Sequence, residues 1–165
     1  MPVSAREPLR ASRSEHRAGC RSEGFLDADK LAGPILVLDD SPEILTLIET
    51  VLREDGFDVQ TARSNDEALK KAKLAMPSLV LLDVGLPPTT DEIFVAALHE
   101  LYGPRIPVVV VSAVSEPAFQ RAVSRTGAAD AIHKPFDISD LLAGVRRAVN
   151  GFGDPSAGPN TAFAT

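Results

Sequence analysis

The stretch SLVLLDVGLPP, from Ser78 to Pro88, contains the feature that decides the fold. Its apolar run at residues 79–82 has no polar alternation, so it predicts a strand inside a sheet that is covered on both faces. The run ends in a carboxylate, Asp83, which is costly to bury unless a partner compensates its charge. Asp83 therefore either caps the next element or stands at a strand end to take part in chemistry.

The hydrophobic pattern changes period repeatedly between Pro34 and Asn150, which is the region that we predict to be folded. Short apolar or β-branched runs predict strands, and apolar residues at i, i+3, i+4 and i+7 predict helices. The predicted strands are 35–38, 57–61, 79–83, 108–111 and 131–133, and the predicted helices are 42–55, 68–76, 94–101, 118–126 and 141–149. This alternation requires parallel strands joined by right-handed crossovers, with helices on both faces.

The two flanking segments differ from this region in composition. Residues 1–33 carry five arginines among Ser, Glu, Ala and Gly without sustained periodicity, so we expect a disordered leader. Residues 151–165 are rich in Gly, Pro and Ala, and we expect a flexible tail. The prediction is one folded domain at 34–150.

The composition argues against several classes of protein. The net charge is -6 and no basic stripe is visible, which is unlike a nucleic-acid-binding domain. No apolar run approaches the roughly 20 residues that span a bilayer, and the arginine-rich start lacks the apolar core of a secretory signal. The single cysteine, Cys20, excludes an internal disulfide. We expect a cytoplasmic protein that contacts neither nucleic acid nor membrane directly.

Polar side chains stand where the predicted strands end: Asp39, Asp40, Asp83, Ser112 and Lys134. Parallel sheets bind ligands beyond the carboxyl ends of their strands, so these groups are predicted to share one crevice. Three carboxylates there repel one another, and a hard cation such as Mg²⁺ is the usual remedy. Carboxylates, cation, ammonium and hydroxyl together suit phosphoryl transfer, with one aspartate as the nucleophile.

Each of these residues also has a structural interpretation. The Asp39-Asp40 pair could cap the first helix, with Ser41 as N-cap and Pro42 at the first helical position. Asp83 taken alone is slightly more often structural than reactive. The combination of residues favours the metal and phosphoryl site, and Ser41 can cap the helix in either case.

Four motifs, ILVLDDSPE, PSLVLLDVGLP, IPVVVVSA and GAADAIHKPF, occur in this order between Ile35 and about Val149. On these motifs the chain resembles the receiver domain of response regulators in two-component signalling. The resemblance implies a flavodoxin-like, doubly wound α/β fold. Its five-stranded parallel sheet would have the order 2-1-3-4-5 and would be accompanied by five helices.

The resemblance also implies roles for the strand-end residues. Asp83 would accept a phosphoryl group from a phosphohistidine on a sensor histidine kinase or histidine phosphotransferase. Ser112 would hydrogen-bond the phosphoryl group and Lys134 would pair with it, and the Lys134–Pro135 bond is expected to be cis. Mg²⁺ would be held by Asp40 directly, by Asp39 through a water, by Asp83 and by the Gly85 carbonyl.

The expected activity follows from these roles. The chain is predicted to be a stand-alone phosphoacceptor and not an enzyme. Its output would be phosphorylation-modulated contact with an unidentified downstream protein, through the surface near the fourth helix, fifth strand and fifth helix. The alternative is an interaction module that keeps the fold but works independently of phosphorylation.

Three features depart from the family pattern. Ala131 stands where many members carry Tyr or Phe, an aromatic that swings inward on phosphorylation, so that two-state element cannot operate in its usual form. The segment 87–91 reads PPTTD where an Asp-Gly turn is typical. Gly85 and Val114 are small or apolar at positions that border the attacking water, which predicts an altered phosphoryl lifetime.

His133 is expected to point away from the Lys134 side chain by strand alternation, and no role is assigned to it.

Overall fold

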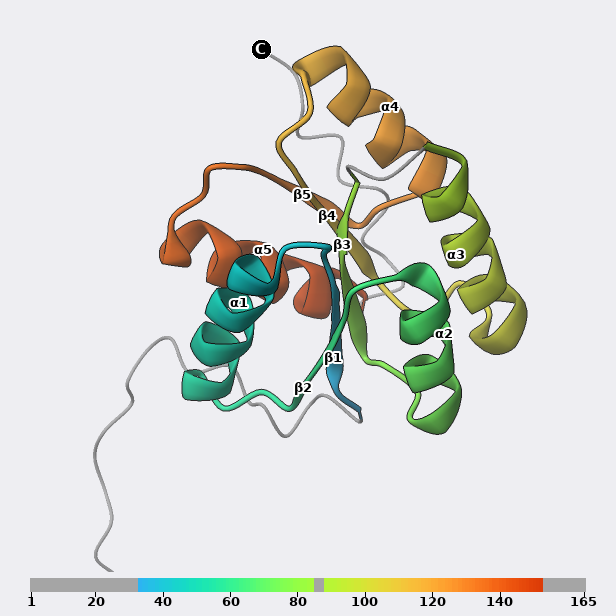
Figure 1. Cartoon of the computed structure of the whole chain (residues 1–165), viewed down its shortest axis with the longest axis horizontal. Helices are drawn as coiled ribbons and strands as arrows, with labels where there is room; N and C mark the ends of the chain where they lie inside the picture. The colour runs from blue at the N-terminus through green and yellow to red at the C-terminus, as the bar shows by residue number, and fades with distance from the viewer. Residues whose placement is uncertain (1–32, 85–87, 153–165) are drawn as a thin grey trace, which may run out of the picture.

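The computed structural model describes residues 33–84 and 88–152. The expected leader up to residue 32, Gly85, and residues 153–165 of the expected tail lie outside the described residues. In the described part, strands and helices alternate along the chain (Figure 1). They are β1 (Ile35–Leu38), α1 (Pro42–Glu54), β2 (Val59–Ala62), α2 (Asn65–Leu74), β3 (Leu79–Asp83), α3 (Pro88–Tyr102), β4 (Val108–Ser112), α4 (Glu116–Thr126), β5 (Asp130–His133) and α5 (Ile138–Phe152).

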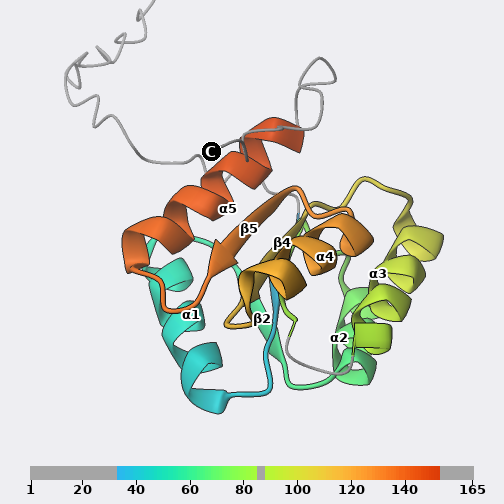
Figure 2. The ribbon, with the colours of Figure 1, turned by 90° about the horizontal axis from the view of Figure 1, so that it is seen from above.

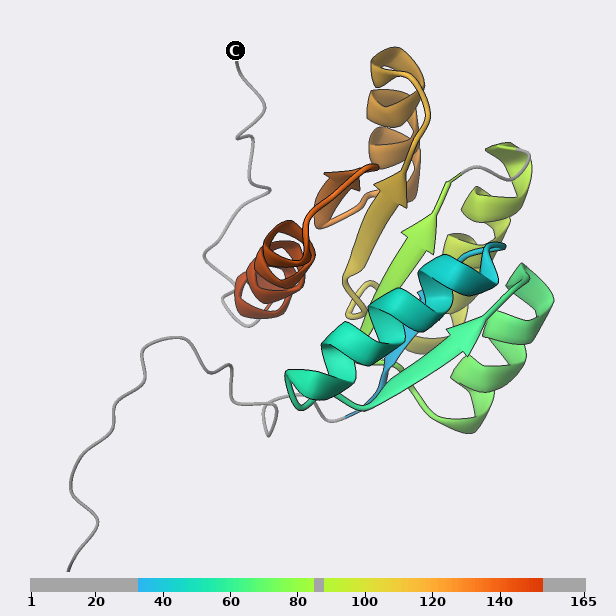
Figure 3. The same ribbon diagram turned by 60° about the vertical axis from the view of Figure 1, so that its left-hand side comes forward.

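The strands form one parallel sheet in the order β2-β1-β3-β4-β5, which confirms the predicted fold. The central strands β1 and β3 are buried on both faces, as their continuous apolar runs predicted. Figures 2 and 3 show α1 and α5 on one face of the sheet and α2, α3 and α4 on the other.

Two hydrophobic cores result from this sandwich of helices around the sheet. Alternate strand residues such as Val37 and Leu81 pack towards α1 and α5, whereas Leu38 and Leu82 pack towards α2, α3 and α4. A fully buried Leu or Val stabilises the fold by about 1.5–3 kcal/mol. The two cores therefore hold the strands rigidly, and the strand ends are fixed in position.

Several element boundaries differ from the predicted ones, and two of the differences have a clear local cause. The second strand begins at Val59 and not at Phe57, because Phe57 still closes α1: its N–H donates to the carbonyl of Leu52 at 3.0 Å, beside Gly56 with φ of 92°. Helix α2 begins three residues earlier than its apolar spacing indicated, because Ser64 caps it and accepts a hydrogen bond from a main-chain N–H.

Helix α5 continues to Phe152 and so extends two residues past the predicted domain boundary. None of the helices in the described part of the chain is long and apolar enough to cross a membrane.

Candidate functional site

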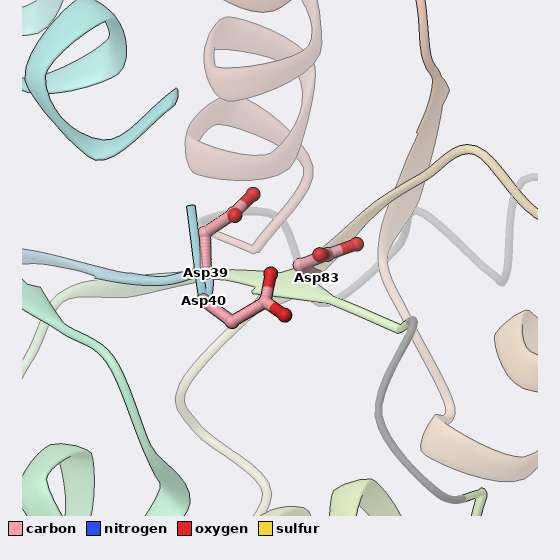
Figure 4. Close-up of side chains that lie close together, drawn as sticks. All are labelled: Asp39, Asp40 and Asp83. Carbon is pink, nitrogen blue, oxygen red and sulfur yellow. The ribbon is translucent and has the colours of Figure 1, made fainter. Parts of the chain in front are cut away.

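The carboxylates gather at the carboxyl ends of two neighbouring strands. Leu38 and Leu82 are partners in the β1–β3 register, so Asp39 and Asp83, which follow them, stand side by side. Figure 4 shows these two side chains with Asp40 at this edge of the sheet. One oxygen of each carboxylate lies within 4.8 Å of the others. Asp39 is buried, Asp83 is partly buried and Asp40 is exposed, so the cluster is open to solvent on the Asp40 side.

Lys134 brings the positive charge to this cluster. Its Nζ donates to Asp39 Oδ2 at 2.6 Å and lies 3.3 Å from Asp83 Oδ2. Its main-chain N–H donates to the Ser112 carbonyl at 2.7 Å, which extends the β4–β5 pairing by one residue. The Lys134–Pro135 bond is cis, as predicted. One ammonium therefore contacts two of the three carboxylates, and it cannot neutralise the cluster when all three are ionised.

Asp83 lies in an environment that opposes its ionisation. Burial raises the pKa of its carboxyl, the Lys134 ammonium lowers this pKa, and the neighbouring charges of Asp39 and Asp40 raise it again. The net direction is upward. A further positive charge at the cluster would relieve the repulsion among the carboxylates and favour the ionised, nucleophilic form.

Asp39 serves the helix and the cluster at once. Its Oδ1 accepts a hydrogen bond from the Ser41 N–H at 2.8 Å, while its Oδ2 binds Lys134. Ser41 is the N-cap of α1, and its Oγ accepts from the Ile44 N–H at 3.4 Å. Asp39 and Ser41 can therefore support the start of α1 while Asp39 also belongs to the acidic cluster.

Ser112 is fully buried, and its hydroxyl is held by the backbone. Its Oγ donates to the Val84 carbonyl at 2.7 Å and accepts from the Val114 N–H at 3.3 Å. A group attached to Asp83 can therefore accept a hydrogen bond from the Ser112 hydroxyl only after that hydroxyl has released the Val84 carbonyl.

The donor set suits a hard divalent cation. Mg²⁺ prefers oxygen ligands and keeps several waters, so a half-open cluster of three converging carboxylates meets its needs. Gly85, the fourth predicted ligand, lies outside the described residues. The residues that the structure describes therefore fit the predicted group.

A further acidic residue, Asp91 in the first turn of α3, was not singled out by the sequence analysis as part of the site. It is 3% exposed, and its Oδ1 has no hydrogen-bond partner among the described residues. Burial and the Asp83 charge raise the pKa of Asp91 to about 6, although a hydrogen bond with Asn65 lowers it. An acidic residue in a first helical turn usually indicates a favourable helix terminus and gives no sign of burial.

Comparison with known proteins agrees with this geometry. The family described as the response regulator receiver domain matches residues 35–146. The transcriptional regulatory protein PrrA of Mycobacterium leprae is 36% identical over 112 residues, which are 68% of this chain and 48% of PrrA. The alkaline phosphatase synthesis transcriptional regulatory protein PhoP of Bacillus subtilis is 37% identical over 112 residues, 68% of this chain and 46% of PhoP.

Solved structures give the same result. The chemotaxis protein CheY4 of Vibrio cholerae superposes with a TM-score of 0.63 at 28% identity, covering 70% of this chain and 97% of that one. A CheY-like receiver domain protein of Methanospirillum hungatei gives a TM-score of 0.65 at 25% identity, covering 73% and 95%. The chain belongs to the response regulator receiver domain family. It spans about half the length of the curated relatives that it matches.

Proposed function

We propose that this receiver domain accepts a phosphoryl group on Asp83 from a phosphohistidine of a sensor histidine kinase or histidine phosphotransferase. The observation that carries the proposal is the convergence of Asp39, Asp40, Asp83 and Lys134 at one edge of the sheet, in a member of this family. The domain is then a phosphoacceptor and not an enzyme acting on a further substrate.

The transfer is a displacement at phosphorus. A carboxylate oxygen of Asp83 attacks the phosphorus, an acyl phosphate bond forms, and the phosphorus–nitrogen bond breaks, so the electron pair stays on the donor imidazole. Lys134 faces the charge of the new group, and Ser112 donates to it after releasing the Val84 carbonyl. In hydrolysis a water attacks the same phosphorus, which releases phosphate and restores the Asp83 carboxylate.

Asp39, Asp40 and Asp83 are the residues that would hold Mg²⁺. The ion, when bound, supplies positive charge that neutralises the oxygens of the transferring group. With Asp39 holding the ion through a water, the positive charge of the ion would compete with the Lys134 ammonium for the Asp39 carboxylate, and Lys134 Nζ already lies within reach of Asp83.

The output that we propose is a change in contact with a downstream protein at the surface of α4, β5 and α5. The net charge of -6 argues for a protein partner over nucleic acid or an anionic membrane. The single cysteine and the histidine-kinase donor fit a cytoplasmic location.

Incubation with acetyl phosphate, with and without Mg²⁺, tests the proposal by intact mass. Wild type is expected to gain one phosphoryl group only with Mg²⁺, and Asp83→Asn is expected to gain none. Asp58→Asn, which removes an exposed carboxylate at another edge of the sheet, is the matched control and should behave as wild type. Folded wild-type protein that gains no phosphate from any donor would instead favour the interaction module that works without phosphorylation.

A further inference from the structure

His133, the last residue of β5, contacts two different loops at the carboxyl edge of the sheet. Its Nε2 lies 3.0 Å from the Val114 carbonyl oxygen, in the loop that follows Ser112. Its Nδ1 lies 2.9 Å from the carbonyl oxygen of Lys134. One imidazole ring therefore contacts both the backbone of the loop after Ser112 and the backbone of Lys134, whose side chain lies beside Asp83.

Both ring contacts require a hydrogen on the nitrogen. A carbonyl oxygen only accepts, so each of the two contacts is favourable only if the ring nitrogen carries a proton. A neutral imidazole has one N–H and can donate to one of the two carbonyls, whereas the imidazolium donates to both. The ring can therefore donate a hydrogen bond to the Val114 carbonyl, to the Lys134 carbonyl, or to both, depending on which nitrogens carry a hydrogen.

The same ring also packs against α4. The ring centroids of His133 and Phe119 are 5.1 Å apart with an interplanar angle of 53°, a tilted arrangement within the favourable range for aromatic pairs. Phe119 is buried in the core beneath α2, α3 and α4. A displacement of the His133 ring is therefore felt by a core residue of α4.

A continuous series of contacts connects this ring to the hydroxyl of Ser112. The Val114 N–H donates to Ser112 Oγ, and the Val114 carbonyl oxygen is the atom that lies 3.0 Å from His133 Nε2. Ser112 and His133 are also direct partners in the β4–β5 register. If Ser112 turned its hydroxyl towards a phosphoryl group, it would leave the Val84 carbonyl and loosen its contact with the Val114 N–H, which would allow the adjacent Val114 carbonyl to move relative to His133.

The surroundings leave room for such a change. Ala131, Ile132, Asp140 and Arg147 line a surface pocket together with His133. Arg147 Nε lies 2.6 Å from Asp130 Oδ2, so the Arg147 side chain is already paired with a carboxylate. The small side chain of Ala131 leaves His133 as the aromatic ring that faces α4 from β5 in the described structure.

We propose that His133 is a positioning residue that couples the loop after Ser112 to α4, and that its ring exchanges hydrogen-bond partners when Asp83 is phosphorylated. The proposal rests on phosphoryl acceptance by Asp83. It assigns to this side chain the communication between the acidic cluster and the surface of α4 and β5.

Ring ¹⁵N NMR tests the exchange of partners directly. Spectra of the full chain are recorded with Mg²⁺, before and after addition of beryllofluoride, a phosphoryl mimic, and the His133 signals are identified by their loss in His133→Phe. The expected result is a change in the pattern of the two ring nitrogens in wild type that is absent in Asp83→Asn. An unchanged His133 pattern in protein whose Asp83 amide responds to beryllofluoride would overturn the proposal.

Variants test the coupling to α4. His133→Phe keeps an aromatic ring beside Phe119 but removes both donors, so we expect normal phosphate incorporation and at least a twofold smaller beryllofluoride-induced shift of the α4 amides. His133→Gln retains a side-chain N–H donor and is expected to restore part of that shift. His99→Phe on α3 is the matched control and should leave it unchanged.

The outcomes separate the two levels of the account. If His133→Phe incorporates phosphate and its α4 amides shift as in wild type, the coupling role of His133 is refuted and the proposed function stands. Wild-type protein that incorporates no phosphate refutes the proposed function and the role of His133 with it.

Discussion

Replacement of Asp91 by Asn is expected to stabilise the domain at neutral pH. The Asp91 carboxyl is 3% exposed, faces the charge of Asp83 and leaves one oxygen without a described partner. Its pKa is raised from 3.8 to about 6. At about 1.4 kcal/mol per pKa unit this displacement corresponds to on the order of 3 kcal/mol of stability lost when the group ionises. Asn keeps the shape and an oxygen that can accept a hydrogen bond from Asn65.

The sign of the effect follows from proton linkage. Below the unfolded pKa of 3.8 the Asp91 carboxyl is protonated in both states and the penalty is absent. Between 3.8 and about 6 the unfolded chain releases the proton while the folded protein keeps it, so the free energy of unfolding falls as the pH rises. Above about pH 6 the full penalty is present in wild type and absent in Asp91→Asn.

Urea unfolding without divalent cations measures this difference. We expect Asp91→Asn and wild type to have similar stability at about pH 4 and to diverge by up to about 3 kcal/mol at pH 7.5. Asp58→Asn, at an exposed position, should show no comparable divergence. A difference between Asp91→Asn and wild type that stays constant from pH 4 to pH 7.5 would refute the assignment of the penalty to the ionised Asp91.

Three further substitutions probe the site and the two cores. Lys134→Met removes the ammonium 3.3 Å from Asp83 and should slow phosphorylation by acetyl phosphate about a hundredfold in a mass time course. Phe94→Ala removes a side chain that is 2% exposed and should cost about 3–5 kcal/mol in urea unfolding, whereas an unchanged stability would contradict the placement of Phe94 in the core. Gly144→Ala places a Cβ 2.7 Å from Ile132 Cδ1, the flexible end of that side chain, so the gain in helix propensity should offset the contact and leave the free energy of unfolding within about 1 kcal/mol of wild type. A loss of more than about 3 kcal/mol would show that Ile132 cannot move aside.

The order of strands and helices could be predicted because the central strands are buried on both faces. Their unbroken apolar runs, such as residues 79–82, have no competing helical interpretation at that length. The start of α3 could not be predicted in this way, because its first turns expose Ile93 and bury Asp91. An exposed apolar residue and a buried acidic residue are the reverse of what an amphipathic helix shows, and the apolar residues follow helical spacing only from Phe94 onwards.

The convergence of the carboxylates was predictable because the carboxyl ends of parallel strands share one edge. The resemblance to the family added the prediction that Asp83 is the carboxylate that reacts. The contacts of His133 were not predictable, since they join its ring to main-chain carbonyls of Val114 and Lys134. The position of a loop carbonyl depends on how the loop folds, and side-chain alternation along a strand carries no information about it.

The most direct test of the central claim is to locate the phosphoryl group chemically. Borohydride reduces an acyl phosphate to an alcohol, so a phosphorylated aspartate becomes homoserine, which peptide fragmentation assigns to one position. After treatment with acetyl phosphate and Mg²⁺, we predict homoserine at position 83 and intact aspartate at Asp39, Asp40 and Asp91. Homoserine at one of these three positions, or at none in protein that has gained phosphate, would contradict the assignment of Asp83 as the phosphoacceptor.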